Sequence, residues 1–172
     1  NPFFAEVTRL VGEGRIGRLV GSATNWLTRL RPVEGFPGGR NDWHFREDTG
    51  GELIQHFCHV FDWMRVLGGD FTAVTATQNH LLDTDLPIED TWNISLQYAS
   101  GALAHFHSSM RNPLHAEMGW IEGGEGSLEW EWSRTPRLLF YENTCVPKPA
   151  KGHVLDMPDM KTAPRDVVTA FT

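Results

Sequence analysis

The sequence of 172 residues lacks the features that mark several large classes of protein. It has only two cysteines, Cys58 and Cys145, which form no disulfide framework and suit a reducing compartment, so we expect a cytoplasmic location. No hydrophobic run approaches the roughly 18 residues of a membrane span, and the first residues do not resemble a signal peptide. The formal net charge of -7 argues against nucleic acid as a partner, because such binding depends largely on Lys and Arg. These absences predict a globular domain with neither nucleic-acid nor membrane partners.

The sequence also lacks internal repeats, low-complexity tracts and an initiator methionine. It begins at Asn1 and stops at Thr172, inside a helix predicted to start at Arg165. A chain of this length buries enough surface to hold its own core. We therefore expect a single domain over residues 1–172, truncated at both ends relative to a longer parent protein.

Hydrophobic periodicity and turn residues predict an α+β fold. One helix spans the first twelve residues, with Asn1 as N-cap and Pro2 at its first position, and a second runs without interruption over residues 52–67. Strands are predicted at residues 18–28, 71–79, 91–98, 102–110, 116–122, 127–132 and 137–141. Hairpin turns between consecutive strands require antiparallel pairing, so we expect a large, mostly antiparallel open sheet with helices on one face. Residues 31–49 form a long loop and residues 146–164 an extended segment.

The segment Gly12–Gly17 matches the dinucleotide-binding pattern G-x-G-x-x-G. That pattern works when a strand enters it and a helix leaves it, because the pyrophosphate binds at the N-terminal amides of the departing helix. Here a helix enters and a strand leaves. We therefore interpret these glycines as a helix end and a turn, with no cofactor bound.

The richest segment for chemistry is Gln55–Asp62. On a helix, Gln55, His56 and His59 would lie along one edge, with Asp62 one turn further on. Three interpretations stay open: a histidine general base near a substrate hydroxyl, a metal site formed by His56, His59 and Asp62, or a helix with two ordinary polar-edge histidines.

Aromatic and basic residues form a second candidate group in the long loop. Trp43, His44 and Arg46 directly precede the Gly-Gly helix start, and an indole face with a guanidinium suits a polyhydroxylated or anionic small ligand. The alternative is a surface loop held down by its tryptophan. His105 and His107 share one face of a strand, where cross-sheet hydrogen bonding is the favoured interpretation.

Several motifs, in order, resemble the C-terminal domain of the Gfo/Idh/MocA family, which includes glucose–fructose oxidoreductase and inositol 2-dehydrogenase. They are Asn1–Phe4 with Gly14–Val20, then Trp43–Arg46, Gly50–Ile54 with Cys58–Asp62, Glu89–Thr91 with Ser100–Leu103, and Gly123–Leu128. The resemblance covers the chain from Asn1 to about Trp132. It implies a sheet-and-helix fold like the C-terminal domain of glyceraldehyde-3-phosphate dehydrogenase.

The resemblance also implies a function. Family members transfer a hydride between a secondary alcohol of a sugar or cyclitol and NAD or NADP, and the cofactor domain and its catalytic Lys precede this domain. Their catalytic histidine aligns with His59, with Gln55 and His56 as its neighbours, and Trp43, His44, Arg46 and Asp62 would lie on the substrate side. The chain would then be the substrate-binding half of an NAD(P)-dependent oxidoreductase, and a homo-oligomer, dimer or tetramer, through its sheet face. Alone, it is expected to bind no cofactor and to be inactive.

Two residues depart from the family pattern. Gln55 stands where the family usually has a carboxylate, and an uncharged amide cannot tune the histidine as a carboxylate would, which leaves that role to His56 or Asp62. Phe57 replaces a frequent glycine and narrows the space above the helix. Two other functions therefore stay open: a non-catalytic binding or assembly module that uses the open sheet face, and a metal-dependent enzyme that uses His56, His59 and Asp62.

Overall fold

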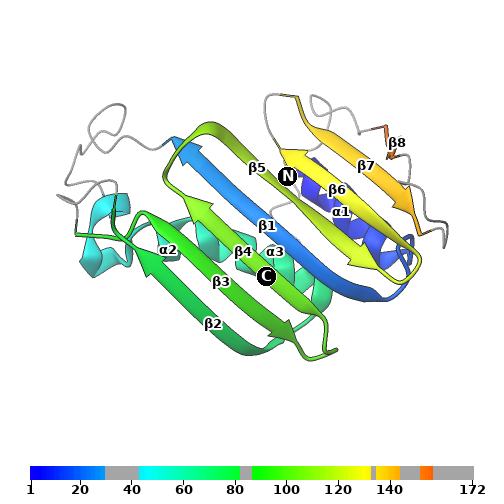
Figure 1. The fold of residues 1–172 in the computed structure, drawn as a ribbon, viewed down its shortest axis with the longest axis horizontal. Helices are drawn as coiled ribbons and strands as arrows, with labels where there is room; N and C mark the ends of the chain where they lie inside the picture. The colour runs from blue at the N-terminus through cyan, green and yellow to red at the C-terminus, as the bar shows by residue number, and fades with distance from the viewer. Residues whose placement is uncertain (30–42, 82–86, 133–134, 144–151, 157–172) are drawn as a thin grey trace.

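The computed structural model describes residues 1–29, 43–81, 87–132, 135–143 and 152–156. In these residues, one open sheet of eight strands has the order β2-β3-β4-β1-β5-β6-β7-β8, with three α-helices on one face (Figure 1). β1 and β4 run parallel, and every other neighbouring pair is antiparallel. The predicted α+β fold, a mostly antiparallel open sheet with helices on one face, is confirmed.

The helices and strands lie close to their predicted ranges. The helical elements are α1 (Pro2–Gly12), the short 3-10 helices η2 (Trp43–Phe45) and η3 (Glu47–Thr49), α2 (Gly51–Gln55) and α3 (Phe57–Gly68). The strands are β1 (Leu19–Arg29), β2 (Phe71–Asn79), β3 (Thr91–Tyr98), β4 (Leu103–Ser109), β5 (Arg111–Gly123), β6 (Gly126–Trp132), β7 (Arg137–Glu142) and β8 (His153–Val154). None of the described helices is long and apolar enough to cross a membrane.

The structure corrects two details of the prediction. The single helix over residues 52–67 is wrong, because the helix is interrupted at His56 and divides into α2 and α3. The all-hairpin pairing is also incomplete, because β1 inserts between β4 and β5 and pairs with β4 in parallel. The break at His56 and the parallel pairing of β1 with β4 both depend on contacts between residues that are distant in sequence. Cys145, most of residues 31–49 and 146–164, and the predicted helix start at Arg165 lie outside the described residues.

Helix α1 begins and ends as its sequence predicts. The side chain of Asn1 accepts a hydrogen bond from the backbone N–H of Phe3 at 3.0 Å, which caps the first turn. The helix ends at Gly12, and Gly14 and Gly17 both have positive φ in the turn that leads into β1. The G-x-G-x-x-G segment is therefore a helix end and a turn.

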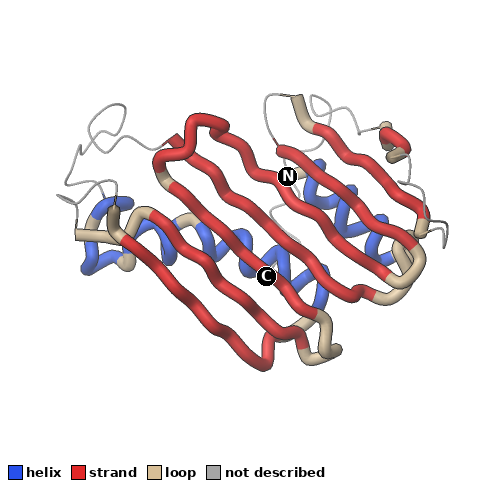
Figure 2. Tube along the Cα trace, in the orientation of Figure 1, coloured by secondary structure: helices blue, strands red, loops and turns tan. Residues whose placement is uncertain are grey.

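Two hydrophobic cores lie between the helices and the sheet. α3 covers β3 and β4 through buried residues such as Phe57, Met64 and Phe106, and α1 covers β5 to β7 through Phe3 and Trp130, among others. Trp63 of α3 packs against both cores. Figure 2 shows the helices behind the sheet, so none of the described helices covers the opposite face, which we call the uncovered face.

Candidate active site

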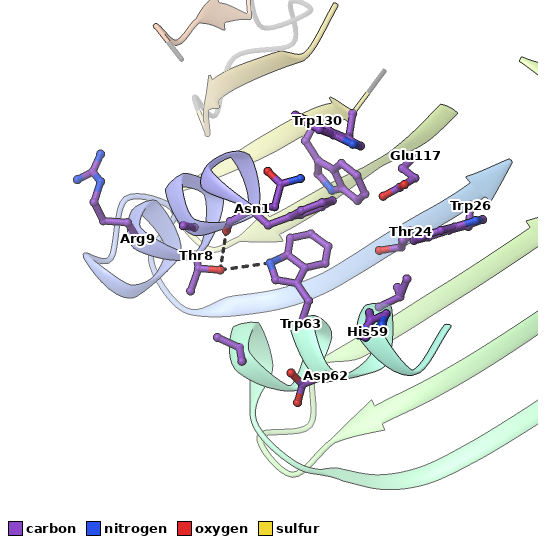
Figure 3. A pocket seen from close by; sticks show the side chains of 15 residues that line it. Asn1, Thr8, Arg9, Thr24, Trp26, His59, Asp62, Trp63, Glu117 and Trp130 are labelled. Carbon is purple, nitrogen blue, oxygen red and sulfur yellow. Dashed lines mark hydrogen bonds between the residues drawn. The ribbon is translucent and has the colours of Figure 1, made fainter. Parts of the chain in front are cut away.

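A cavity of about 730 Å³ opens where α1 and α3 diverge over the sheet. Its lining residues come from α1, β1, α3, β5 and β6 and include the tryptophans Trp26, Trp63, Trp130 and Trp132 (Figure 3). This volume lies within the range of about 300–1,000 Å³ that is usual for small-molecule sites. The cavity is thus large enough for a sugar-sized ligand.

The apolar wall of the cavity is built from aromatic rings that contact one another. The indoles of Trp63 and Trp130 meet edge to face with ring centroids 5.1 Å apart, and the ring of Phe4 contacts both, at 4.8 and 5.6 Å. The Nε1 of Trp63 donates to the hydroxyl of Thr8 at 3.2 Å (Figure 3). These contacts hold the indole surfaces in place before any ligand arrives.

Two predicted site residues, His59 and Asp62, line this cavity. They lie on α3 one turn apart, and both side chains are exposed to solvent. Across the cavity in Figure 3 stand Thr24 of β1, which is buried, and Glu117 of β5. An accessible imidazole therefore shares one cavity with a hydroxyl and two carboxyl groups.

Glu117 is the most perturbed acid of this cavity. It lies on the helix-covered face of β5, and its register partners on the two neighbouring strands are Trp26 and Trp132. Burial beside these indoles raises the pKa of Glu117 to about 7, although the nearby charge of His56 acts in the opposite direction. The Glu117 carboxyl therefore changes charge near neutral pH.

Gln55 and His56 have structural contacts of their own. The Gln55 amide donates to the backbone carbonyl of Thr49 at 3.0 Å, which ties α2 to η3. The His56 ring stacks on Trp26 with centroids 6.3 Å apart and lies 4.8 Å from the ring of His44. The interruption after Gln55 also means that Gln55 and His59 belong to different helices.

The three predicted substrate-side residues that precede α2 divide into two groups. Trp43 and His44 stack on each other with centroids 3.5 Å apart and join the aromatic cluster around His56. Arg46 instead forms a bidentate ion pair with Asp48 in η3, and both side chains are exposed. None of Trp43, His44 and Arg46 lines the large cavity.

The described residues do not support the metal interpretation. Within them, no three His, Cys, Asp or Glu side chains are placed to hold a metal ion. His59 and Asp62 face the cavity, whereas His56 stacks between Trp26 and His44. His56, His59 and Asp62 therefore do not form the ligand set considered from the sequence.

The described residues also lack the strand, glycine-rich turn and helix that bind the pyrophosphate of a dinucleotide. Gly12–Gly17 follows α1 and precedes β1, so no helix N-terminus faces this turn. No strand, glycine-rich turn and helix follow one another in that order elsewhere in the described ranges with the G-x-G-x-x-G pattern. No cofactor contact is assigned to them.

Comparison with known proteins identifies the family of this chain. Residues 4–129 match the model of the GFO/IDH/MocA C-terminal domain. The chain belongs to this family. No curated protein matches the chain.

Solved structures share the fold of this GFO/IDH/MocA C-terminal domain. Levoglucosan dehydrogenase in complex with NADH superposes with a TM-score of 0.74 at 20% identity, over 90% of this chain and 44% of that one. An NAD binding oxidoreductase from Klebsiella pneumoniae gives 0.73 at 18% identity, over 91% of this chain and 45% of that one. An oxidoreductase domain protein from Kribbella flavida gives 0.72 at 21% identity, over 90% and 44%. The chain thus spans less than half the length of these proteins.

Sequence reasoning missed Glu117, Thr24 and Trp26. A signal for Glu117 was present, because the period of two along residues 116–122 places it on the same face as Gly119 and the buried Ile121. A carboxyl on the buried face of a strand is uncommon and marks a candidate functional residue. Nothing in the pattern showed that α3 would bring His59 to the same cavity.

Proposed function

We propose that this GFO/IDH/MocA domain is the substrate-binding half of an NAD(P)-dependent oxidoreductase that acts on a secondary alcohol of a sugar, cyclitol or similar polyol. One observation carries the proposal: His59, which the family resemblance proposes as the catalytic histidine, is exposed and lines a cavity of about 730 Å³ walled by tryptophans. Indole faces suit the C–H surface of a sugar ring, and the polar groups between them suit its hydroxyls.

The chemistry assigned to this domain is limited to positioning the alcohol and moving its proton. A nitrogen of the His59 imidazole accepts the hydroxyl proton when the alcohol is oxidised and returns it when the ketone is reduced. Asp62, one turn away and also exposed, is the carboxylate on the same helix that can orient this imidazole. In such enzymes the nicotinamide accepts the hydride when the alcohol is oxidised and donates it when the ketone is reduced, and we assign no described residue to its binding.

The test is turnover by the protein encoded together with any sequence upstream of Asn1, assayed with NAD and NADP across a panel of polyols. His59→Asn should lower turnover of an active substrate by about 10²–10⁴-fold, which is the usual contribution of a general acid–base group. His105→Asn is the matched control, because His105 is exposed on the opposite face of the sheet. Turnover of His59→Asn within about twofold of the parent would contradict the role, and no turnover with any polyol would favour a non-catalytic module.

The same proposal includes self-association through the open sheet face. The exposed large apolar side chains that the described residues place on this face include Val20, Leu103 and Trp120, at 54, 62 and 47%. A face with such residues is a typical assembly surface, and we propose a dimer or tetramer. Trp120→Asp should shift the sedimentation coefficient of the chain towards the monomer, whereas Leu81→Asp, which lies outside the sheet, should not. A monomeric parent chain at high concentration would contradict this part.

A further inference from the structure

Glu117 has an unusual position for a carboxyl group. It lies in one cross-strand row between Trp26 and Trp132. Its side chain lines the cavity that holds His59 (Figure 3). Burial of a carboxyl among indoles is unfavourable, so such a group is retained where it has a partner or a task. The acid–base chemistry proposed above uses His59 and Asp62 and leaves Glu117 without a role.

The charges around the cavity do not favour an anion. Arg9 is the only Arg or Lys among the described lining residues, and its guanidinium is held by two carboxylates, Glu6 and Glu13. The carboxyl groups of Glu117 and Asp62 line the same cavity and can add negative charge to it. A ligand that carries a carboxylate or phosphate would therefore find repulsion from these carboxyl groups and no unpaired Arg or Lys side chain in the described lining.

Two indole N–H groups in the walls of the cavity lack hydrogen-bond partners in the described part of the chain. The indole Nε1 atoms of Trp26 and Trp130 are buried and have no hydrogen-bond partner within the described residues, and Trp130 is only 1% exposed. Such donors are unfavourable unless an acceptor reaches them. Neither Nε1 atom is open to the cavity in this structure, so the indoles contribute their ring faces to the lining and a ligand oxygen would reach the N–H groups only after an indole shifts.

We propose that Glu117 is the specificity-determining residue of this cavity: it accepts hydrogen bonds from hydroxyls of an uncharged sugar or cyclitol ring and excludes sugar acids and sugar phosphates. The inference rests on the proposed function only in that the cavity is the substrate site. Thr24, buried beside Glu117 on the neighbouring strand, supplies a further hydroxyl, and the indoles supply the stacking surface. Glu117 selects against negatively charged ligands because its carboxylate repels them. An uncharged amide at the same position would not repel them.

The test compares neutral sugars with their acids in binding to the 172-residue chain at pH 8, by titration calorimetry or by quenching of the cavity tryptophans. The probes are glucose with glucuronate, galactose with galacturonate, and glucose with glucose 6-phosphate. At least one neutral member should bind about tenfold or more tightly than its anionic counterpart. Glu117→Gln should narrow that ratio to within about threefold, and Glu117→Asp, which keeps the charge, should preserve it.

Glu129→Gln is the matched control, because Glu129 lies on the uncovered face of the neighbouring strand and contacts Arg137 and Tyr141 there. It should leave the ratio unchanged. Anionic members that bind as well as neutral ones to the parent chain would overturn the proposal, and so would an unchanged ratio in Glu117→Gln or no binding by any neutral sugar. The result of this binding test is independent of the turnover test. His59→Asn can abolish turnover while binding still prefers neutral sugars, and binding can lack this preference while turnover still depends on His59.

Discussion

The strongest stability prediction concerns Glu117→Gln. The pKa of Glu117 is about 7 in the folded chain and has its ordinary value of 4.5 when the chain is unfolded. The folded state therefore holds this proton more tightly, and the resulting stabilisation is complete below about pH 4.5 and is lost as the pH rises towards 7. One pKa unit corresponds to about 1.4 kcal/mol, so the ionised carboxyl costs the folded chain at most about 3 kcal/mol above pH 7, and less where water reaches it.

Glutamine has the shape of the protonated carboxyl and does not ionise. The free energy of unfolding of Glu117→Gln should therefore exceed that of the parent by about 1–3 kcal/mol at pH 8 and by much less at pH 5, measured by urea denaturation. Glu122→Gln is the control, because Glu122 lies on the same strand with its side chain exposed on the other face. An equal difference for Glu117→Gln at both pH values, or a loss of stability at pH 8, would refute the reasoning.

Three further substitutions test the fold around the cavity. For each, the change in the free energy of unfolding is obtained from the shift of the denaturation midpoint. Gly119→Ala should cost about 3 kcal/mol or more, because its Cβ would lie 1.9 Å from the backbone carbonyl oxygen of Ala23 in the central strand pair; near-parental stability would contradict this register. Gln55→Glu should cost about 1–2 kcal/mol, because a carboxylate would replace the amide that donates to the Thr49 carbonyl, and no loss would show that this hydrogen bond is unimportant. Asn1→Ala should cost about 1 kcal/mol through loss of the α1 cap, whereas Asn1→Asp should retain most of it.

The local elements could be predicted because their signals are local. The cap at Asn1, the glycine turn after α1 and the hairpin at Gly101, which has a positive φ, each depend on residues within a few positions of one another. The role of His59 rests on the family resemblance and stays a prediction. That His59 lies in a ligand-sized cavity depends on α1 and α3 packing on different parts of one sheet.

The helix interruption at His56 shows why periodicity was not sufficient. Residues 52–67 contain no glycine or proline, so nothing in the sequence marks a break there. In the folded chain the His56 ring instead contacts Trp26 of β1 and His44 of η2, which are 30 and 12 residues away. Contacts of this kind override local helix propensity.

By itself the sequence determined the alternation of helices and strands, the family motifs and the residue types available for chemistry, because these depend on neighbours along the chain. Only the tertiary structure decided which of them meet. It placed β1 between β4 and β5, put Gln55 and His59 on different helices, and brought Glu117 into the cavity of His59 between Trp26 and Trp132. The physical reason is that strand order and helix packing bury surfaces far apart in sequence, and the pKa of Glu117 follows from that burial.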